Sequence, residues 1–495
     1  MTALSLAVAM AGCSTIERAR PALALPASEA RAPLAERVRA ALERPALSGT
    51  RWGLLVVDDT GREVVAIAPD ERFVPASNTK MFTIAAAFMT IPGIATATPA
   101  AAVRLEARSG RREPDVVLVG SGDATLADRA GCASNCLSHL ADAVARSGVR
   151  AVHDVIGDDR LFPDERWGPG WSWNNLQTRS GTATSALTVN DNEVAFSVAP
   201  ANAAGQPPTV TWVKGDAYYA LANEATTVAS GAKNEVQVER LPGTRTVRVY
   251  GTVAIGATPD VQRLGIEDPA HFAATRFRRL LEARGIRVTG DAVARHRPLL
   301  TGDDAARRPS PSPAPLARLV APPLAANLIN AQKVSQNLHT ELLLRQVGLA
   351  AGGSGSIADG HAVVRRMLDR AGVARRSYDF SDGSGMSTYN RVSPRAAVQF
   401  LRWTAAQPWG AAFRETLPIA GVDGTLSGRF VGTPLAGRLF AKTGTLNGVN
   451  ALAGFLKTAS GRELTFALYA NDRPAGSPSA TAAAEAALLL ISAEN

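Results

Sequence analysis

The stretch FVPASNTKMFTIAAAF, residues 73–88, decides the fold and the chemistry that we expect of this chain. Its second half is apolar and rich in alanine, which predicts a buried helix. Ser77 would lie at the first turn of that helix, where free backbone N–H groups and the positive end of the helix dipole meet. Lys80 follows one turn later, so its amine lies on the same helix face as the Ser77 hydroxyl. Burial and a second cation can lower the pKa of such a lysine until it accepts the serine proton.

Two further motifs, Ser335-Gln336-Asn337 and Lys442-Thr443-Gly444-Thr445, supply the other residue types that this chemistry needs. Lysine is scarce, with six in 495 residues, yet two of the six lie in the first and third motifs. Lys442 is the candidate second cation. We expect Ser335 to relay a proton to a leaving amine, and Asn337 to hold Lys80 and a substrate carbonyl. On a strand, residues 442–445 would dock an extended peptide.

Each motif also has a purely structural interpretation. A serine with a lysine three residues later is usually a solvated helix face, and Ser335 and Asn337 can be helix caps. Lys457-Thr458-Ala459 shows how a partial match arises by chance. The order and combination of all three motifs are more specific than any one of them, and together they form a signature of serine acyl-enzymes.

Composition and length exclude several classes of protein. At 495 residues the chain is long enough for about three domains, or for one domain with large insertions. Its 46% hydrophobic and 20% charged residues exclude a disordered or collagen-like chain. The most apolar stretches, residues 3–13 and 482–492, fall short of the ~20 residues that a membrane-spanning helix needs. The net charge of +9 comes mostly from scattered arginines, so we expect no nucleic-acid partner.

Both ends of the chain are expected to supply helix and antiparallel strand, with an insertion between them. Apolar runs at 52–58 and 63–67 flank an Asp-Thr-Gly turn, which predicts a hairpin. Short β-rich runs with glycine-rich breaks fill residues 94–298, and a smaller module is expected at 190–262. The proline-rich stretch 307–323 would lead back out of the insertion. The other elements expected are helices at 34–42, 326–348, 357–371 and 480–492, and strands at 439–446, 450–457 and 464–469.

With these motifs the sequence resembles the serine acyl-enzymes of the penicillin-binding type, and within them the low-molecular-mass class C D-alanyl-D-alanine carboxypeptidase/endopeptidases. The resemblance covers most of the chain. It includes GSGDATL at 120–126, GDD at 157–159, GWSW at 170–173, DGSGMS at 382–387 and AGVDGTL at 420–426. About 250 residues separate Lys80 from Ser335, a gap that class A β-lactamases lack. Gln336 and Ala124 depart from the Asp and Pro common in the family, and neither removes a catalytic group.

The resemblance implies an α+β fold of the penicillin-binding/serine β-lactamase-like transpeptidase type. Such a fold is an antiparallel sheet flanked by helices, here with a large β-rich inserted region. The parts expected are a leader and tether at 1–27, a peptidase domain in two parts at 28–93 and 299–495, and an inserted domain at 94–298.

The resemblance also implies the roles of the residues. Ser77 would be the nucleophile, Lys80 its base, Ser335 and Lys442 proton-transfer partners, and Asn337 a positioning residue. The N–H groups of Ser77 and Thr445 would form the oxyanion hole. The substrate implied is the stem peptide of peptidoglycan, cleaved after a D-alanine through a covalent ester, without a metal or other cofactor. Its terminal carboxylate would lie along Thr443, Gly444 and Thr445 beside Lys442, as the carboxylate of penicillin does, so β-lactam antibiotics are expected to be covalent inhibitors.

The insertion offers a candidate for substrate selection. Many stem peptides carry a free ammonium one residue before the scissile D-alanine pair, and an enzyme that recognises it needs a carboxylate at the edge of the cleft. We expect Asp158 to make this contact, with Asp159 as the register alternative and the loop 384–386 as the next candidate. The structural interpretation is a solvated turn, in which Asp is common.

The N-terminus and the cysteines predict an exported protein. Residues 1–13, MTALSLAVAMAGC, end in the small-small-Cys pattern of a bacterial lipoprotein processing site, although no Lys or Arg precedes Arg18. We expect a periplasmic location, with either a lipid anchor to the outer membrane at Cys13 or a degenerate signal with an incidental cysteine. Cys132 and Cys136 could then close a small disulfide loop. A zinc site there lacks further ligands.

Two alternative functions share parts of this pattern. A serine β-lactamase or esterase would also use Ser77 and Lys80, but it needs fast deacylation, and no water-activating glutamate is evident. A non-catalytic, lipid-anchored muropeptide-binding protein has no use for an activated nucleophile. A long-lived penicillin label, rapid turnover or no label would distinguish the three. The balance of carboxypeptidase and endopeptidase activity is left open by the sequence.

Overall fold

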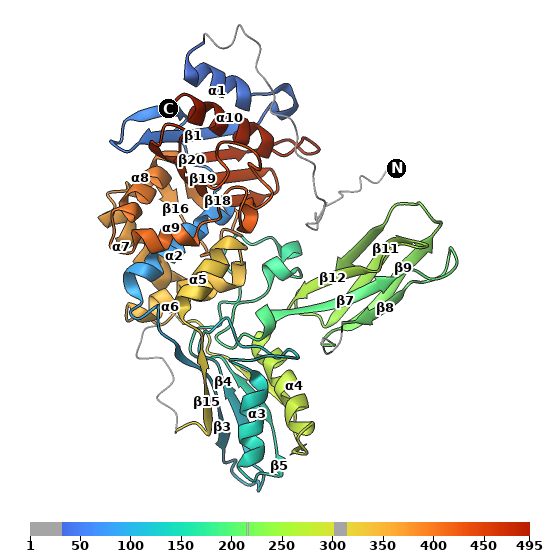
Figure 1. The fold of residues 1–495 in the computed structure, drawn as a ribbon. Coiled ribbons are helices and arrows are strands. Elements are labelled where there is room, and N and C mark those ends of the chain that lie inside the picture. Colours follow the sequence, from blue (N-terminus) through green and yellow to red (C-terminus); the bar gives the residue numbers. More distant parts are fainter. Residues whose placement is uncertain (1–31, 214, 216, 301–313) are drawn as a thin grey trace.

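The computed structural model describes residues 32–213, 215, 217–300 and 314–495, which form three lobes (Figure 1). The predicted leader with Cys13, and residues 307–313 of the predicted proline-rich connection, lie outside the described residues. A peptidase lobe contains the first and the last described elements, an α/β lobe is inserted into it, and a β module projects from the α/β lobe. Within these described ranges, no helix is long and apolar enough to span a bilayer.

A five-stranded antiparallel sheet forms the centre of the peptidase lobe, with the strand order β18-β19-β20-β1-β2. The predicted hairpin and the three predicted C-terminal strands are confirmed. Their bounds are β1 Arg51–Asp58, β2 Glu63–Ile67, β18 Leu439–Leu446, β19 Val449–Lys457 and β20 Glu463–Asn471. Strand β18 lies at the edge of the sheet, and an edge strand can pair with an extended peptide.

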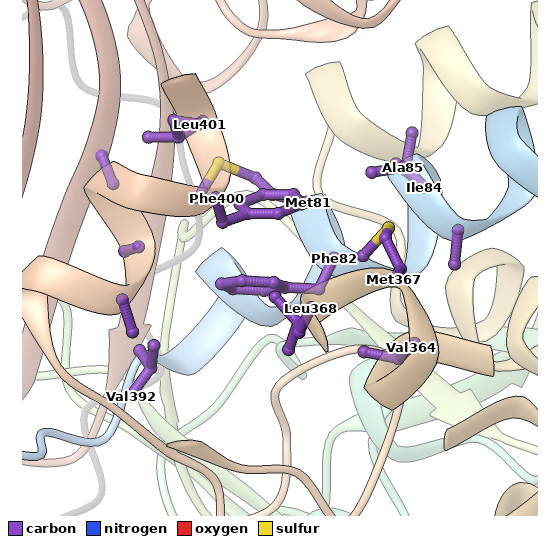
Figure 2. Close-up of a cluster of buried hydrophobic side chains, with 14 of the residues drawn as sticks. Met81, Phe82, Ile84, Ala85, Val364, Met367, Leu368, Val392, Phe400 and Leu401 are labelled. Atoms are coloured by element: carbon purple, nitrogen blue, oxygen red, sulfur yellow. The ribbon is translucent and has the colours of Figure 1, made fainter. Parts of the chain in front are cut away.

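Helices cover both faces of this sheet. On one face α1 (Leu34–Leu42) and α10 (Thr481–Ala493) bury apolar side chains against the strands. On the other face α2 (Thr79–Thr90) packs against α8 (Pro394–Ala405), and the rings of Phe82 and Phe400 stack 4.2 Å apart (Figure 2). Because α2 is apolar almost all round, it lies within this core. The lobe also contains α5 Leu324–Lys333, α6 Asn337–Ala350, α7 Ile357–Arg370, α9 Gly410–Thr416, β16 Tyr378–Asp379 and β17 Arg391–Val392.

The inserted lobe is α/β rather than only β-rich. Its mixed sheet has the order β14-β6-β4-β3-β15, and α3 and α4 bury apolar side chains in the same core. Strand β15 pairs with β3, so the lobe extends to residue 321, beyond the boundary expected at 298. The bounds are β3 Thr98–Glu106, β4 Asp115–Val119, α3 Leu137–Arg146, β5 Ala151–Val152, β6 Val155–Asp158, α4 Pro269–Glu282, β13 Arg287–Val288, β14 Ala292–Arg295 and β15 Ala317–Ala321.

The projecting module consists of two three-stranded sheets, with the orders β12-β7-β8 and β10-β11-β9 (Figure 1). Its extent, residues 193–265, is close to the module expected at 190–262. The bounds are β7 Glu193–Ala199, β8 Thr209–Trp212, β9 Ala220–Val228, β10 Glu235–Glu239, β11 Thr246–Ala254 and β12 Asp260–Gly265.

Cys132 and Cys136 form the predicted disulfide. The loop that it closes lies directly before α3. Within this loop the Asn135 amide donates to Thr125 Oγ1 at 2.9 Å and also to Asp123. The disulfide loop is therefore joined to the GSGDATL motif of the inserted lobe.

Candidate active site

Ser77 lies in a 3-10 turn, Ala76–Asn78, that leads directly into α2. Ala76 adopts a φ of +47°, in the left-handed region that residues with a side chain rarely take. Gly385 packs so closely against this turn that a Cβ there would lie 1.9 Å from the Ala76 carbonyl oxygen. A neighbouring loop thus holds a strained turn, and the turn presents Ser77 at the N-terminal end of α2, where developing negative charge is stabilised.

The Lys80 amine is fully buried and makes three hydrogen bonds. It donates to Ser77 Oγ at 3.0 Å, to Asn337 Oδ1 at 2.6 Å and to the Ser384 carbonyl oxygen at 2.6 Å. Burial lowers the pKa of Lys80 to about 7, although the negative charges of Asp382 and Glu341 oppose that shift. A neutral amine has two hydrogens and one lone pair. Because the two carbonyl oxygens can only accept, they take the hydrogens, and the lone pair faces the Ser77 hydroxyl.

Ser335 lies where the helix expected at 326–348 is interrupted between α5 and α6. It adopts a φ of +61°, again in the left-handed region. The Lys442 amine is fully buried and donates to Ser335 Oγ at 3.0 Å and to the Thr443 carbonyl oxygen at 3.0 Å. Burial, and then the positive charge of Lys80, lower the pKa of Lys442 well below its usual value. The second-cation hypothesis had Lys442 lower the pKa of Lys80; here burial lowers the pKa of Lys80, and the repulsion between the two amines lowers that of Lys442.

Asn337 is the first residue of α6, and its side chain joins the two lobes. Its Oδ1 accepts from Lys80, and its Nδ2 donates to the Ser180 carbonyl oxygen of the insertion at 2.9 Å. This pair of partners fixes the orientation of the amide, because Oδ1 must face the amine and Nδ2 the carbonyl. One Nδ2 hydrogen is left for another acceptor.

The outer edge of β18 faces the site. The Ala441 N–H donates to the Pro418 carbonyl oxygen, away from β19, and alternation along a strand turns the N–H groups of Thr443 and Thr445 the same way. On that side, neither N–H has a protein acceptor among the described residues. Gly444 fits there because a Cβ would lie 2.6 Å from the Pro75 carbonyl oxygen. The edge can therefore pair with an extended peptide or receive an oxyanion.

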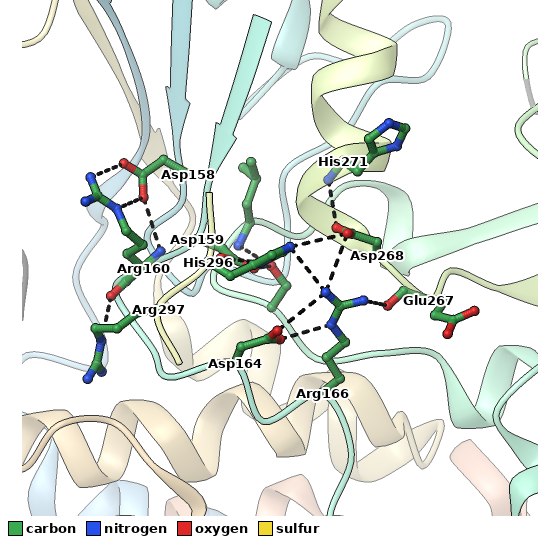
Figure 3. A network of polar contacts seen from close by, with 12 residues as sticks. Asp158, Asp159, Arg160, Asp164, Arg166, Glu267, Asp268, His271, His296 and Arg297 are labelled. Carbon is green, nitrogen blue, oxygen red and sulfur yellow. Dashed lines mark hydrogen bonds and ion pairs between the residues drawn. The ribbon is translucent and has the colours of Figure 1, made fainter. Parts of the chain in front are cut away.

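Asp158 is paired with arginines inside the insertion (Figure 3). The residue lies at the end of β6 and is 5% exposed. Both carboxylate oxygens accept from Arg160, at 3.0 and 2.7 Å, and Arg104 and Arg295 lie within 3.5 and 3.7 Å. A substrate ammonium would have to compete with these guanidinium groups, so the contact with Asp158 stays a prediction that this geometry does not favour.

The register alternative, Asp159, is also engaged inside the insertion (Figure 3). Its carboxylate accepts from His296 Nδ1 at 2.9 Å and from Ser185 Oγ at 2.8 Å. Hydrogen bonds to Asp159 and Asp268 raise the pKa of His296 to about 10, so the imidazolium bridges the two carboxylates. Both aspartates of the GDD motif therefore stabilise the inserted lobe.

The sequence analysis missed the groups of Glu341 and of the loop 382–385 that help to hold Lys80. The Ser384 carbonyl accepts from its amine, and the Glu341 carboxylate accepts from the backbone N–H groups of Gly383 and Ser384 at 2.9 and 2.8 Å. Asp382 accepts from the Gly385 N–H at 2.9 Å. A signal for Glu341 was available, since it lies one helical turn after Asn337 and directly before the apolar run 342–344.

Taken together, the fold and this geometry define a class of protein. A serine hydroxyl at a helix N-terminus is bonded to a buried amine, a second serine is bonded to a second buried amine, and a strand edge runs alongside. These are the parts of a serine acyl-enzyme that uses lysine rather than histidine as its base.

Comparison with known proteins identifies the family. The chain matches the D-Ala-D-Ala carboxypeptidase 3 (S13) family over residues 34–494. It is 34% identical over 479 residues to the D-alanyl-D-alanine carboxypeptidase of Actinomadura sp. (strain R39), covering 94% of this chain and 86% of that relative. The chain therefore belongs to the S13 family, and it is a serine D-alanyl-D-alanine carboxypeptidase.

Solved structures agree in fold. Penicillin binding protein 4 (dacB) from Haemophilus influenzae has a TM-score of 0.77 and 23% identity, covering 93% of this chain and 98% of that one. The same protein complexed with a novel β-lactam has a TM-score of 0.72 and 21% identity, covering 92% and 98%. The predicted penicillin-binding-type fold is confirmed.

Proposed function

We propose that Ser77 is the nucleophile of this carboxypeptidase and that neutral Lys80 is its general base. One observation carries the proposal: a buried amine lies 3.0 Å from Ser77 Oγ, with its hydrogens committed to two carbonyl oxygens. Burial lowers the pKa of Lys80 to about 7, so a large share of the amine is neutral near neutral pH.

In the proposed reaction Ser77 Oγ attacks the carbonyl carbon before the terminal D-alanine of a stem peptide. Its proton passes to Lys80. The carbon–nitrogen bond breaks, and the leaving nitrogen takes a proton from Ser335, which Lys442 replenishes through their 3.0 Å hydrogen bond. Water then attacks the ester and returns one proton to Lys442 through Ser335. The carbon–oxygen bond breaks, Ser77 Oγ takes the proton that Lys80 held, and the water oxygen ends in the new carboxylic acid, which ionises.

The substrate would lie along the outer edge of β18. The N–H groups of Ser77 and Thr445 would stabilise the oxyanion. The terminal carboxylate would meet Thr443, Thr445 and Lys442, and its negative charge would raise the lowered pKa of Lys442 and favour the protonated amine. The Thr443 hydroxyl is 2.7 Å from the Thr425 hydroxyl, so one of the two can donate to the other. The close fit of Gly444 on the Ser77 turn favours this alignment of strand and nucleophile.

β-Lactam antibiotics would acylate Ser77 in the same way, a proposal that the β-lactam complex of the related structure supports. Fluorescent penicillin should label the wild type and an exposed-serine control, Ser109→Ala, and leave Ser77→Ala unlabelled. A long-lived label supports a penicillin-binding carboxypeptidase. Rapid loss of label would favour the β-lactamase alternative, and labelling of Ser77→Ala would refute the assignment of the nucleophile.

DD-endopeptidase activity is the finer proposal about the substrate. An endopeptidase cleaves the same type of bond when the second D-alanine position carries a cross-linked peptide instead of a free terminal residue. Purified sacculi digested with the enzyme would release uncross-linked muropeptides if it is correct. Release of D-alanine alone, with cross-links intact, would limit the enzyme to carboxypeptidase activity.

We also propose a periplasmic location, with a lipid anchor at Cys13 as the associated hypothesis. The Cys132–Cys136 disulfide supports an oxidising compartment. The leader sequence is the only support for the anchor. Membrane fractionation of the wild type and Cys13→Ala decides between an anchored and an unattached mature form.

A further inference from the structure

Helix α6 contacts Lys80 directly through one residue and indirectly through a second. Asn337 at its first turn accepts directly from the Lys80 amine at 2.6 Å. Glu341, one turn later on the same face, is 1% exposed and does not touch the amine. Its Oε1 instead accepts from the backbone N–H groups of Gly383 and Ser384. The carbonyl of Ser384 is the second acceptor of the Lys80 amine.

The loop that carries this carbonyl is wedged between α6 and the nucleophile turn. A Cβ on Gly383 would lie 2.9 Å from the Thr340 carbonyl oxygen of α6, and a Cβ on Gly385 would lie 1.9 Å from that of Ala76. Thr83 of α2 donates to the Gly383 carbonyl at 2.8 Å. Any rotation of the peptides on either side of Ser384 therefore moves the acceptor away from Lys80.

We infer that Glu341 is a positioning residue for the base: by holding residues 383 and 384 it aims the Ser384 carbonyl at Lys80, so that the amine lone pair faces Ser77. This inference rests on the proposed role of Lys80 as the base. A backbone carbonyl can be aligned only through the groups that bind its neighbours, and Glu341 accepts from the N–H groups of both Gly383 and Ser384.

Buried charges around Glu341 compensate one another. Its Oε2 accepts from Arg345, one further turn along α6, at 3.0 Å. The other charged or titratable groups that interact with it are Lys80, Asp382 and His361. Arg345 also donates to the Glu165 carbonyl at 2.7 Å, which fixes the guanidinium independently. The carboxylate thus has one oxygen for the ion pair and one for the loop.

The test compares Glu341→Leu with a matched control, Asp359→Leu. Asp359 is also a carboxylate that accepts from backbone N–H groups, those of Ser354 and Ser356, but it lies on α7 and makes no bond to residues 382–385 in the described part of the chain. Glu341→Leu is made together with Arg345→Met, so that no unpaired guanidinium is left buried. Penicillin acylation rates are measured from pH 5 to 9, alongside thermal unfolding.

Glu341→Leu with Arg345→Met should lower the plateau acylation rate about 10- to 100-fold, as expected when a reacting group is misaligned. The acid limb of the pH profile should move to lower pH, because a negative charge near the Lys80 ammonium is removed. Asp359→Leu should leave the plateau rate and the acid limb unchanged. The inference would be overturned by a folded Glu341→Leu variant with the wild-type rate and acid limb, or by rate losses in both variants that only follow their losses of stability.

Crystal structures separate this inference from the proposed function. In Glu341→Leu with Arg345→Met, the Ser384 carbonyl should turn away from the Lys80 amine by more than hydrogen-bond distance. An unmoved carbonyl would overturn the positioning role whatever the kinetics show. If penicillin does not acylate the wild type while the carbonyl does move, the proposed function fails and the positioning role stands.

Discussion

Replacing Lys80 by methionine tests the state of the buried amine through stability alone. Burial lowers the pKa of Lys80 from 10.5 to about 7. Below pH 7 the amine is protonated in the folded and the unfolded state, and the folded state carries the whole desolvation cost of a buried ammonium. Between pH 7 and 10.5 the unfolded state holds the proton and the folded state does not, so the free energy of unfolding rises with pH.

The size of this effect follows from the shift. At about 1.36 kcal/mol for each pKa unit, the wild type should gain about 4 kcal/mol of stability from pH 6 to pH 10 through Lys80. Lys80→Met cannot show that gain. The free energy of unfolding of Lys80→Met, minus that of the wild type, should therefore be larger at pH 6 than at pH 10.

Denaturant unfolding at pH 6 and pH 10, followed by circular dichroism, measures the difference. Lys457→Met is the control, because Lys457 is an exposed lysine at the end of β19. The control should follow the wild type at both pH values. If the stability difference between the wild type and Lys80→Met were the same at pH 6 and pH 10, Lys80 would not titrate in this range and the reasoning would be refuted.

Three further predictions follow from the site and the insertion. Lys80→Arg should lose at least about tenfold in acylation rate, or ~1.4 kcal/mol, because a guanidinium stays protonated at working pH; a smaller loss would contradict the general-base role. Asp158→Asn should destabilise the protein by about 3 kcal/mol. It should lower kcat/KM equally for peptides with a free and with an acetylated side-chain amine, and a loss confined to the free amine would support the substrate contact. Thiol titration of the denatured, unreduced protein should detect neither Cys132 nor Cys136, and two reactive thiols would exclude the disulfide.

The proposed nucleophile and its neighbours could be picked out from the sequence because the chemistry needs particular side chains at fixed spacing. Ser77 and Lys80 had to share a helix face, and the scarcity of lysine made Lys442 stand out. The structure brings the three motifs together through the hydrogen bonds of Lys80 to Asn337 and of Lys442 to Ser335. Strands of the central sheet were predictable for a similar reason, since apolar runs between turn residues mark them.

The rest depended on contacts that leave little trace in a sequence. The Ser384 carbonyl belongs to the backbone, so no side chain marks its role in holding Lys80. The sequence did not reveal the partners of Asp158, because Arg104 and Arg295 come from two other strands. The insertion boundary was misplaced because β15 returns to pair with β3 after the part of the chain that looked like a linker.

Titration of the Lys80 amine itself tests the central claim most directly. The chain has six lysines, so nitrogen-15 labelling of lysine gives a simple spectrum, and the Lys80 signal is assigned by its absence in Lys80→Arg. A pKa near 7 in the unliganded wild type is the result we predict. A Lys80 amine that stays protonated above pH 9 would contradict its role as the base that activates Ser77.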